Sequence, residues 1–153
     1  MLHKFAVGTF AIATLAVSSF ALAQQKAASG TADEAKAMLE KAVAAVKADK
    51  AKAIGMFKAG EGGFKDRDLY PFCFQIADGV TVAAPASVLG KDVRTLKDPT
   101  GKAFGADLYA AAKDGAVTEV PYMFPRPGET TPVAKVSFVT KVADLGCGVG
   151  YYK

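Results

Sequence analysis

The two cysteines are the most informative of the side chains in this 153-residue sequence that could do chemistry. Cys73 lies within residues 68–84, DLYPFCFQIADGVTVAA, and Cys147 lies within residues 145–153, LGCGVGYYK. Both segments have strand character, so the pair suggests two neighbouring strands joined by a disulfide in an oxidising compartment. The alternative is two buried free thiols that pack as small apolar residues. No C-x-x-C spacing is present, which disfavours thiol–disulfide exchange.

The only histidine, His3, lies near the start of the chain. Residues 1–23 combine a short charged start, a long apolar run and the ending Ala-Leu-Ala, which predicts a cleaved secretory signal; an uncleaved membrane anchor is the alternative. The mature protein would then lack imidazole for a nucleophile–base pair, zinc or haem. We therefore expect no cofactor and no metal site.

Carboxylates offer the remaining route to an enzyme. Asp66, Asp68 and Glu119 could act as acid and base, but nothing in the sequence sets their separation, and ordinary surface acids explain them. We therefore predict that the protein is not an enzyme. Without residues 1–23, 18 basic and 15 acidic side chains leave a net charge of +3, spread along the chain. Since no basic stripe is present, nucleic-acid binding is not expected.

Residues 24–30 form a polar linker that is expected to be flexible, and the domain is expected to span residues 31–153. Thr31 and Glu34 have capping-box spacing at the start of an amphipathic, alanine-rich helix that ends near Asp49. A second short helix should cover residues 52–57 and end before the glycines at 60–63.

Period-2 alternation predicts a first strand over residues 70–77, and Asp78-Gly79 predicts a tight hairpin into a second. Pro121 lacks an amide donor, which favours an edge position for the third strand. In the last strand, alternate glycines form one face, with room for a helix or a ligand to approach. The remaining expected elements are a helix over residues 102–113 and strands over residues 117–124, 133–143 and 145–152.

Six stretches, taken in order, resemble the single Cache domain of type 2, a PAS-like extracytoplasmic sensor. They are DLYPFCF (68–74), VLGKD (88–92), LKDPTGK (96–102), VPY (120–122), KVSFV (135–139) and GCGVGYY (146–152). The resemblance covers residues 31–153. It implies an α+β fold in which a long N-terminal helix packs on a five-stranded antiparallel sheet of order 2-1-5-4-3, with a small-molecule pocket on the other face.

Two departures from the family stand out. Many relatives carry a histidine before the proline that follows the first hairpin, whereas this chain has Ala84-Pro85, so that imidazole contact would be missing. The sequence also ends at Lys153 without membrane helices or an output domain. We therefore expect a stand-alone secreted form that acts through a partner.

The resemblance implies a pocket for small organic acids, which require a cation and hydroxyl or amide donors. Lys135, which interrupts an apolar strand, is the cation we choose; a solvated lysine is the alternative. Tyr122 and Ser137 could donate to the same ligand, unless the tyrosine serves only the core. Tyr70 and Arg67 open the first strand, although Arg67 could be a surface charge. Arg126, in a proline-flanked loop, is expected to be exposed.

These observations together predict a periplasmic or secreted small-molecule sensor domain that acts through a membrane receptor or kinase in signal transduction or chemotaxis. A protein-interaction subunit of a membrane receptor or transporter is the alternative. The sequence leaves open which face of the sheet carries the pocket and Lys135.

Overall fold

The computed structural model describes residues 28–153, so the predicted signal peptide lies outside the described residues. The elements are α1 (Ala32–Ala48), α2 (Lys50–Ala59), β1 (Pro71–Gln75), β2 (Thr81–Ala83), the short 3-10 helix η1 (Val93–Thr95), α3 (Phe104–Ala111), β3 (Thr118–Pro125), β4 (Pro132–Val142) and β5 (Leu145–Tyr152). Every element expected from the sequence is present, with bounds that differ by a few residues at most.

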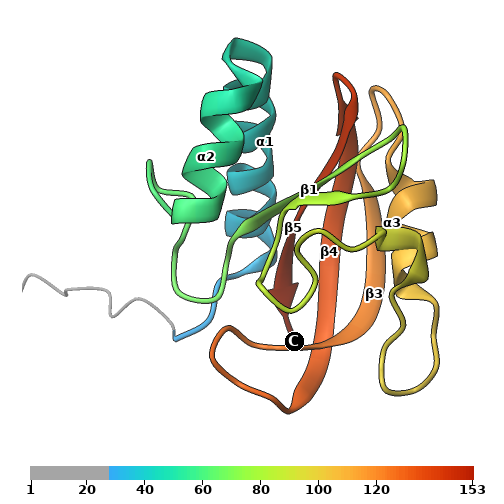
Figure 1. Cartoon of the computed structure of the whole chain (residues 1–153). Coiled ribbons are helices and arrows are strands. Elements are labelled where there is room, and N and C mark those ends of the chain that lie inside the picture. Colours follow the sequence, from blue (N-terminus) through green and yellow to red (C-terminus); the bar gives the residue numbers. More distant parts are fainter. Residues whose placement is uncertain (1–27) are drawn as a thin grey trace, which may run out of the picture.

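The strands form one antiparallel sheet in the order β2-β1-β5-β4-β3, which confirms the predicted α+β fold and its strand order. Helices α1 and α2 cover one face of the sheet, and α3 lies on the other (Figure 1). Strand β3, which contains Pro121, is an edge strand as predicted. Cys73 lies directly opposite Cys147 across β1 and β5, and the two form the predicted disulfide.

Local signals explain how the two N-terminal helices begin and end. The capping box of Thr31 and Glu34 is formed at the start of α1. Asp49 ends α1 and caps α2 by accepting a hydrogen bond from the Lys52 amide at 3.0 Å. Gly60 ends α2 in the left-handed conformation, with a φ of 70°. Apolar residues of both helices pack on the sheet face that carries the disulfide.

The glycines of β5 show which side chains and which helices lie on each face of the sheet. A side chain at Gly146 or Gly148 would collide with the rings of Phe74 and Phe72, and one at Gly150 would collide with Lys135 and Ser137. Lys135 therefore lies on the glycine face, which α3 covers, and the alanine-rich helix lies on the cysteine face. The glycines make room for large side chains of neighbouring strands.

The structure corrects one detail of the predicted hairpin. The β1–β2 turn is wider than a two-residue hairpin, because the Gln75 amide donates to the Val80 carbonyl and only Gly79 of the turn has a positive φ. The Gly30 amide donates to the buried Asp68 carboxylate at 2.7 Å, which holds the end of the predicted linker against the domain. Within residues 28–153, no helix has the length and apolar character that crossing a bilayer requires.

Candidate ligand-binding site

A small chamber of about 30 Å³ lies on the glycine face, between the sheet and the segment from β2 to α3. We call it the lysine chamber. Its lining is aromatic and aliphatic apart from Thr81, two tyrosine hydroxyls and Lys135. The lining residues are Tyr70, Phe72, Thr81, Ala84, Pro85, Val88, Val93, Leu96, Phe104, Leu108, Tyr122, Phe124 and Lys135. This volume holds about one or two water molecules, and ordinary ligand pockets are roughly ten times larger, so the chamber by itself has room only for the end of a ligand. Its walls suit an apolar group.

Lys135 is only 2% exposed and is surrounded by aromatic rings. Its Nζ donates to the hydroxyls of Tyr70 at 2.8 Å and Tyr152 at 3.3 Å. It also lies 4.3 Å, 4.7 Å and 5.2 Å from the ring centroids of Tyr70, Tyr152 and Phe124. Such rings attract a cation through their negative faces. Within residues 28–153, no carboxylate forms an ion pair with this ammonium.

Burial dominates the protonation of this lysine. Desolvation lowers the pKa of Lys135 from 10.5 to about 7, and the charge of Asp68 opposes this shift. Desolvation also raises the pKa of Tyr70 and Tyr122, and it raises that of Tyr152 to about 12. The tyrosines therefore remain neutral hydroxyls near neutral pH, while Lys135 divides between its charged and neutral forms.

Two further predicted residues lie beside Lys135. Tyr122 is opposite it on the neighbouring strand β3, and Ser137 is two positions further along the same strand, β4. The Tyr122 hydroxyl and Ser137 Oγ are 2.9 Å apart and form a buried hydrogen bond. The Tyr122 ring stacks on Phe104 of α3 with centroids 4.5 Å apart. Tyr122 lines the chamber, whereas Ser137 is completely buried beside it and reaches the chamber only through the tyrosine.

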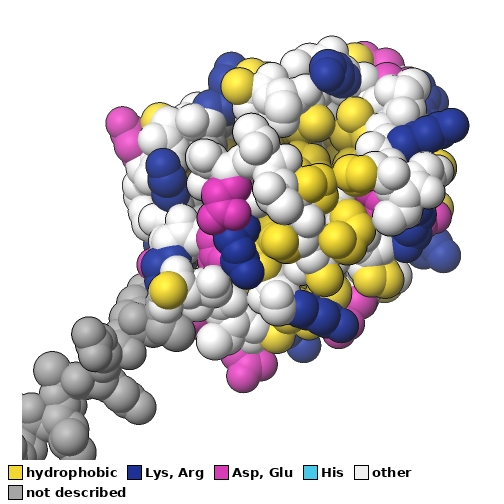
Figure 2. All heavy atoms as spheres, turned by 90° about the horizontal axis from the view of Figure 1, so that it is seen from below, with side chains coloured by type: hydrophobic (Ala, Val, Ile, Leu, Met, Phe, Trp, Pro, Cys, Tyr) yellow, Lys and Arg dark blue, Asp and Glu magenta, His cyan; other side chains and the backbone are white. Residues whose placement is uncertain are grey.

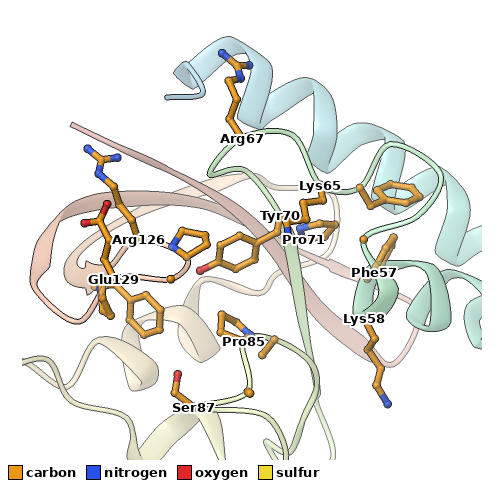
Figure 3. Close-up of a pocket in the computed structure, with 18 of the residues that line it drawn as sticks. Phe57, Lys58, Lys65, Arg67, Tyr70, Pro71, Pro85, Ser87, Arg126 and Glu129 are labelled. Atoms are coloured by element: carbon orange, nitrogen blue, oxygen red, sulfur yellow. The ribbon is translucent and has the colours of Figure 1, made fainter. Parts of the chain in front are cut away.

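An open cleft of about 340 Å³ adjoins the chamber; we call it the outer cleft. The two spaces share four lining residues, so the outer cleft lies directly beside the chamber: Tyr70, Ala84, Pro85 and Phe124. The Tyr70 ring projects into the middle of the cleft, with the β3–β4 loop beside it (Figure 3). Seen from below, apolar side chains gather at the centre of the molecular surface, with lysine, arginine and acidic side chains around them (Figure 2).

The two arginines near the cleft are both paired. Arg67 contacts the cleft, but its side chain points away from Tyr70 (Figure 3) and forms ion pairs with Glu34 at 2.6 Å and Asp66 at 3.0 Å. It therefore lies apart from the chamber that holds the other predicted site residues. Arg126 was expected to be exposed, and this is wrong: its side chain is 25% exposed and pairs with Asp68 at 2.8 Å.

The acids considered for catalysis are dispersed. Asp66 and Asp68 each pair with an arginine, and Glu119 is exposed on β3. None of them lines the lysine chamber. Among residues 28–153, no cluster of three or more histidine, cysteine or acidic side chains could hold a metal ion.

Sequence reasoning missed two residues beside the chamber, Tyr152 and Phe124, and considered Asp68 only as a possible catalytic acid or base. Tyr152 could have been found, because it continues the alternation of the glycine face beyond Gly150. Phe124 and Asp68 carry no comparable signal. They lie near the ends of strands, where the direction of a side chain depends on the loop that follows or precedes.

The comparisons with known proteins agree with this fold. Residues 11–152 match the family described as Single Cache domain 2. No curated protein matches the chain. A methyl-accepting chemotaxis protein from Vibrio parahaemolyticus RIMD 2210633 is 24% identical, with a TM-score of 0.62, 78% of this chain covered and 86% of that chain covered.

Two further solved structures are similar. The periplasmic sensor domain of a chemotaxis protein is 24% identical, with a TM-score of 0.60 and coverage of 78% of this chain and 88% of that chain. A structure described as the structural basis for carboxylic acid recognition by a Cache chemosensory domain is 24% identical. Its TM-score is 0.58, and the match covers 76% of this chain and 84% of that chain. At this identity the likeness establishes the fold. Since the family match spans nearly the whole sequence, the chain belongs to the Single Cache domain 2 family.

Proposed function

We propose that this protein is a periplasmic sensor domain that binds a small carboxylate in the lysine chamber. The observation that carries the proposal is a buried ammonium, Lys135, that faces an apolar chamber beside two hydroxyls and makes no ion pair within residues 28–153. A carboxylate would supply the missing negative charge, and charge-assisted hydrogen bonds are stronger than neutral ones. The apolar lining would cover the end of the ligand that enters the chamber.

In this arrangement, Lys135 and the Tyr70 hydroxyl would contact the carboxylate, and Tyr122 would bound the chamber beside β3. Ser137 would act by fixing the Tyr122 hydroxyl. The ligand would enter through the outer cleft past Tyr70. The carboxylic acid recognised by one Cache chemosensory domain of the same fold supports this ligand class. The chemotaxis proteins of the same fold support a role in signal transduction through a membrane receptor or kinase, rather than in catalysis.

A thermal-shift screen of the purified protein tests the proposal. The panel contains short monocarboxylates, dicarboxylates, amino acids, amines and purines, because a bound ligand raises the unfolding temperature by mass action. The carboxylate that gives the largest shift is then titrated by calorimetry into the wild type and Lys135→Met. We expect the variant to bind at least about tenfold more weakly, since the substitution keeps much of the stem and removes the charge.

Lys58→Met is the matched control, because Lys58 lies on the exposed rim of the outer cleft. It should leave carboxylate binding almost unchanged. Equal affinity of Lys135→Met and the wild type would contradict the proposal. So would a panel in which only amines or purines stabilise the protein.

A further inference from the structure

A buried carboxylate whose charge acts on Lys135 is paired with an arginine. The Asp68 side chain is only 9% exposed, and both of its oxygens are engaged. Oδ1 accepts a hydrogen bond from the Gly30 amide at 2.7 Å, and Oδ2 accepts one from Arg126 Nη1 at 2.8 Å. Asp68 lines neither the chamber nor the cleft. Its charge nevertheless acts on Lys135, Tyr70 and Tyr152.

Arg126 is fixed in its position by more than the ion pair. Its guanidinium lies 4.7 Å from the centroid of the Tyr152 ring, and its Nη1 also donates to Ser29 Oγ at 3.2 Å. The Tyr152 hydroxyl donates to the Pro125 carbonyl at 2.7 Å, one residue before the arginine. The same hydroxyl accepts from Lys135. The β3–β4 loop, Asp68 and the lysine chamber are therefore connected through adjacent contacts.

We propose that Arg126 is a specificity-determining residue for carboxylate ligands, because its ion pair with Asp68 withholds that carboxylate from Lys135 and leaves the ammonium to the ligand. The inference rests on the proposed function. Without Arg126, Asp68 would be a buried charge held only by the Gly30 amide, and an unpaired buried charge is strongly unfavourable. Lys135 is a cation whose protonation is already favoured by the charge of Asp68. Asp68 would turn toward Lys135 and compete with the ligand as an internal carboxylate.

Among the groups around Lys135, the Asp68 carboxylate is the one that would compete with a carboxylate ligand. Tyr70 before β1, Tyr152 of β5 and Tyr122 of β3 are neutral hydroxyls near neutral pH, as their raised pKa values require. The charged groups nearby are Asp68 and Arg126, which form a pair. Loss of the arginine therefore removes one positive charge and leaves the Asp68 carboxylate without its partner.

Calorimetric titration with sodium acetate is the first test, on the wild type, Arg126→Gln, Asp68→Asn and the double variant. Arg126→Gln should weaken acetate binding by about tenfold or more, because the Asp68 carboxylate would occupy the ammonium that acetate needs. A neighbouring opposite charge shifts a pKa by roughly 1–3 units, and each unit corresponds to about a tenfold difference in interaction. The double variant should return to within about threefold of the wild type, because the competing carboxylate is gone. A purely structural role for Arg126 would give no such rescue.

The pKa of Lys135, measured by NMR titration of its ε-methylene group without ligand, is the second test. It should rise by about one unit or more in Arg126→Gln and fall back in the double variant. Because this measurement needs no ligand, it separates the inference from the proposed function. A wild type that binds no carboxylate from the panel overturns the proposed function, whereas an unchanged Lys135 pKa in Arg126→Gln overturns the inference.

Arg94→Gln is the matched control. Arg94 pairs with Asp92 at 2.7 Å and lies 5.3 Å from the centroid of the Tyr109 ring. It therefore repeats the arginine–aspartate–tyrosine arrangement, and it is not one of the residues that line the chamber. It should change neither acetate affinity nor the pKa of Lys135. A double variant that binds acetate no better than Arg126→Gln would also overturn the inference.

Discussion

The two faces of the sheet are stabilised in different ways. On the cysteine face, α1 and α2 cover a continuous apolar cluster and the disulfide joins β1 to β5. On the glycine face, large aromatic side chains fill the space left by the glycines, and a lysine is buried among them. The first face gains stability from apolar burial and a cross-link, whereas the second buries a charge that opposes folding. The proposed binding site therefore lies on the face where a buried charge lowers the stability of the fold.

Removal of the disulfide should have the largest effect. In the double variant Cys73→Ala and Cys147→Ala, the unfolded chain regains the freedom of a loop that spans 74 positions. The chain-entropy model puts this at about 4.5 kcal/mol of unfolding free energy, as an upper figure. Urea denaturation of the oxidised protein and the variant measures the difference. Two titratable thiols in the denatured, unreduced wild type would show that the cysteine face lacks its cross-link.

Lys135 should make the stability of the glycine face depend on pH. The pKa of about 7 in the folded protein lies below the ordinary 10.5, so the unfolded chain binds more protons between these values. The unfolding free energy of the wild type, measured against Lys135→Met, should therefore rise by roughly 1.4 kcal/mol per pH unit above pH 7. The burial penalty is fully present below pH 7.

Denaturant titrations of both proteins from pH 6 to pH 9.5 check this slope. Lys58→Met controls for the loss of one positive charge at an exposed position. A difference between the wild type and Lys135→Met that stays constant across this range would mean that Lys135 keeps its proton in the folded protein. The burial of Lys135 would then cost the glycine face less stability than its low exposure implies, and the two faces would differ less.

Glycine substitutions should have the smallest effects on stability, and they test how tightly the glycine face is packed. Gly55, in α2, has no atom near the position of an added Cβ, so Gly55→Ala should stabilise the protein by about 0.5–1 kcal/mol. Gly150→Ala would force a methyl group against Lys135 and Ser137 and should destabilise it by about 1–3 kcal/mol. Thermal unfolding of both variants measures this. A stabilising Gly150→Ala would show that the glycine face is loosely packed.

Much of the fold could be predicted because its signals are local or one-dimensional. The capping box at Thr31 and Glu34 and the alternation around Cys73 involve residues a few positions apart. The two cysteines added one long-range constraint, and it was enough to place β1 beside β5. The β1–β2 turn was misjudged because a preference for positive φ at Gly79 does not set the length of the turn.

The candidate site could be predicted only in part. Lys135, Tyr122 and Tyr70 line one chamber, and Ser137 supports it, but their roles in binding stay predictions. Arg67 points elsewhere, since Glu34 and Asp66 hold it. The exposure of Arg126 was misjudged because a proline-flanked loop is usually at the surface, and the sequence does not show that this one folds back over Tyr152.

The sequence by itself determined the helices, the strands and the disulfide partners, since residue type and spacing decide these through local propensity and compartment. The tertiary structure alone decided that Lys135 is buried on the glycine face, next to a hydroxyl 65 positions away, and that Asp68 pairs with an arginine 58 positions away. The charge state of a buried group depends on desolvation and on neighbours from other strands. These arise only when the sheet is assembled.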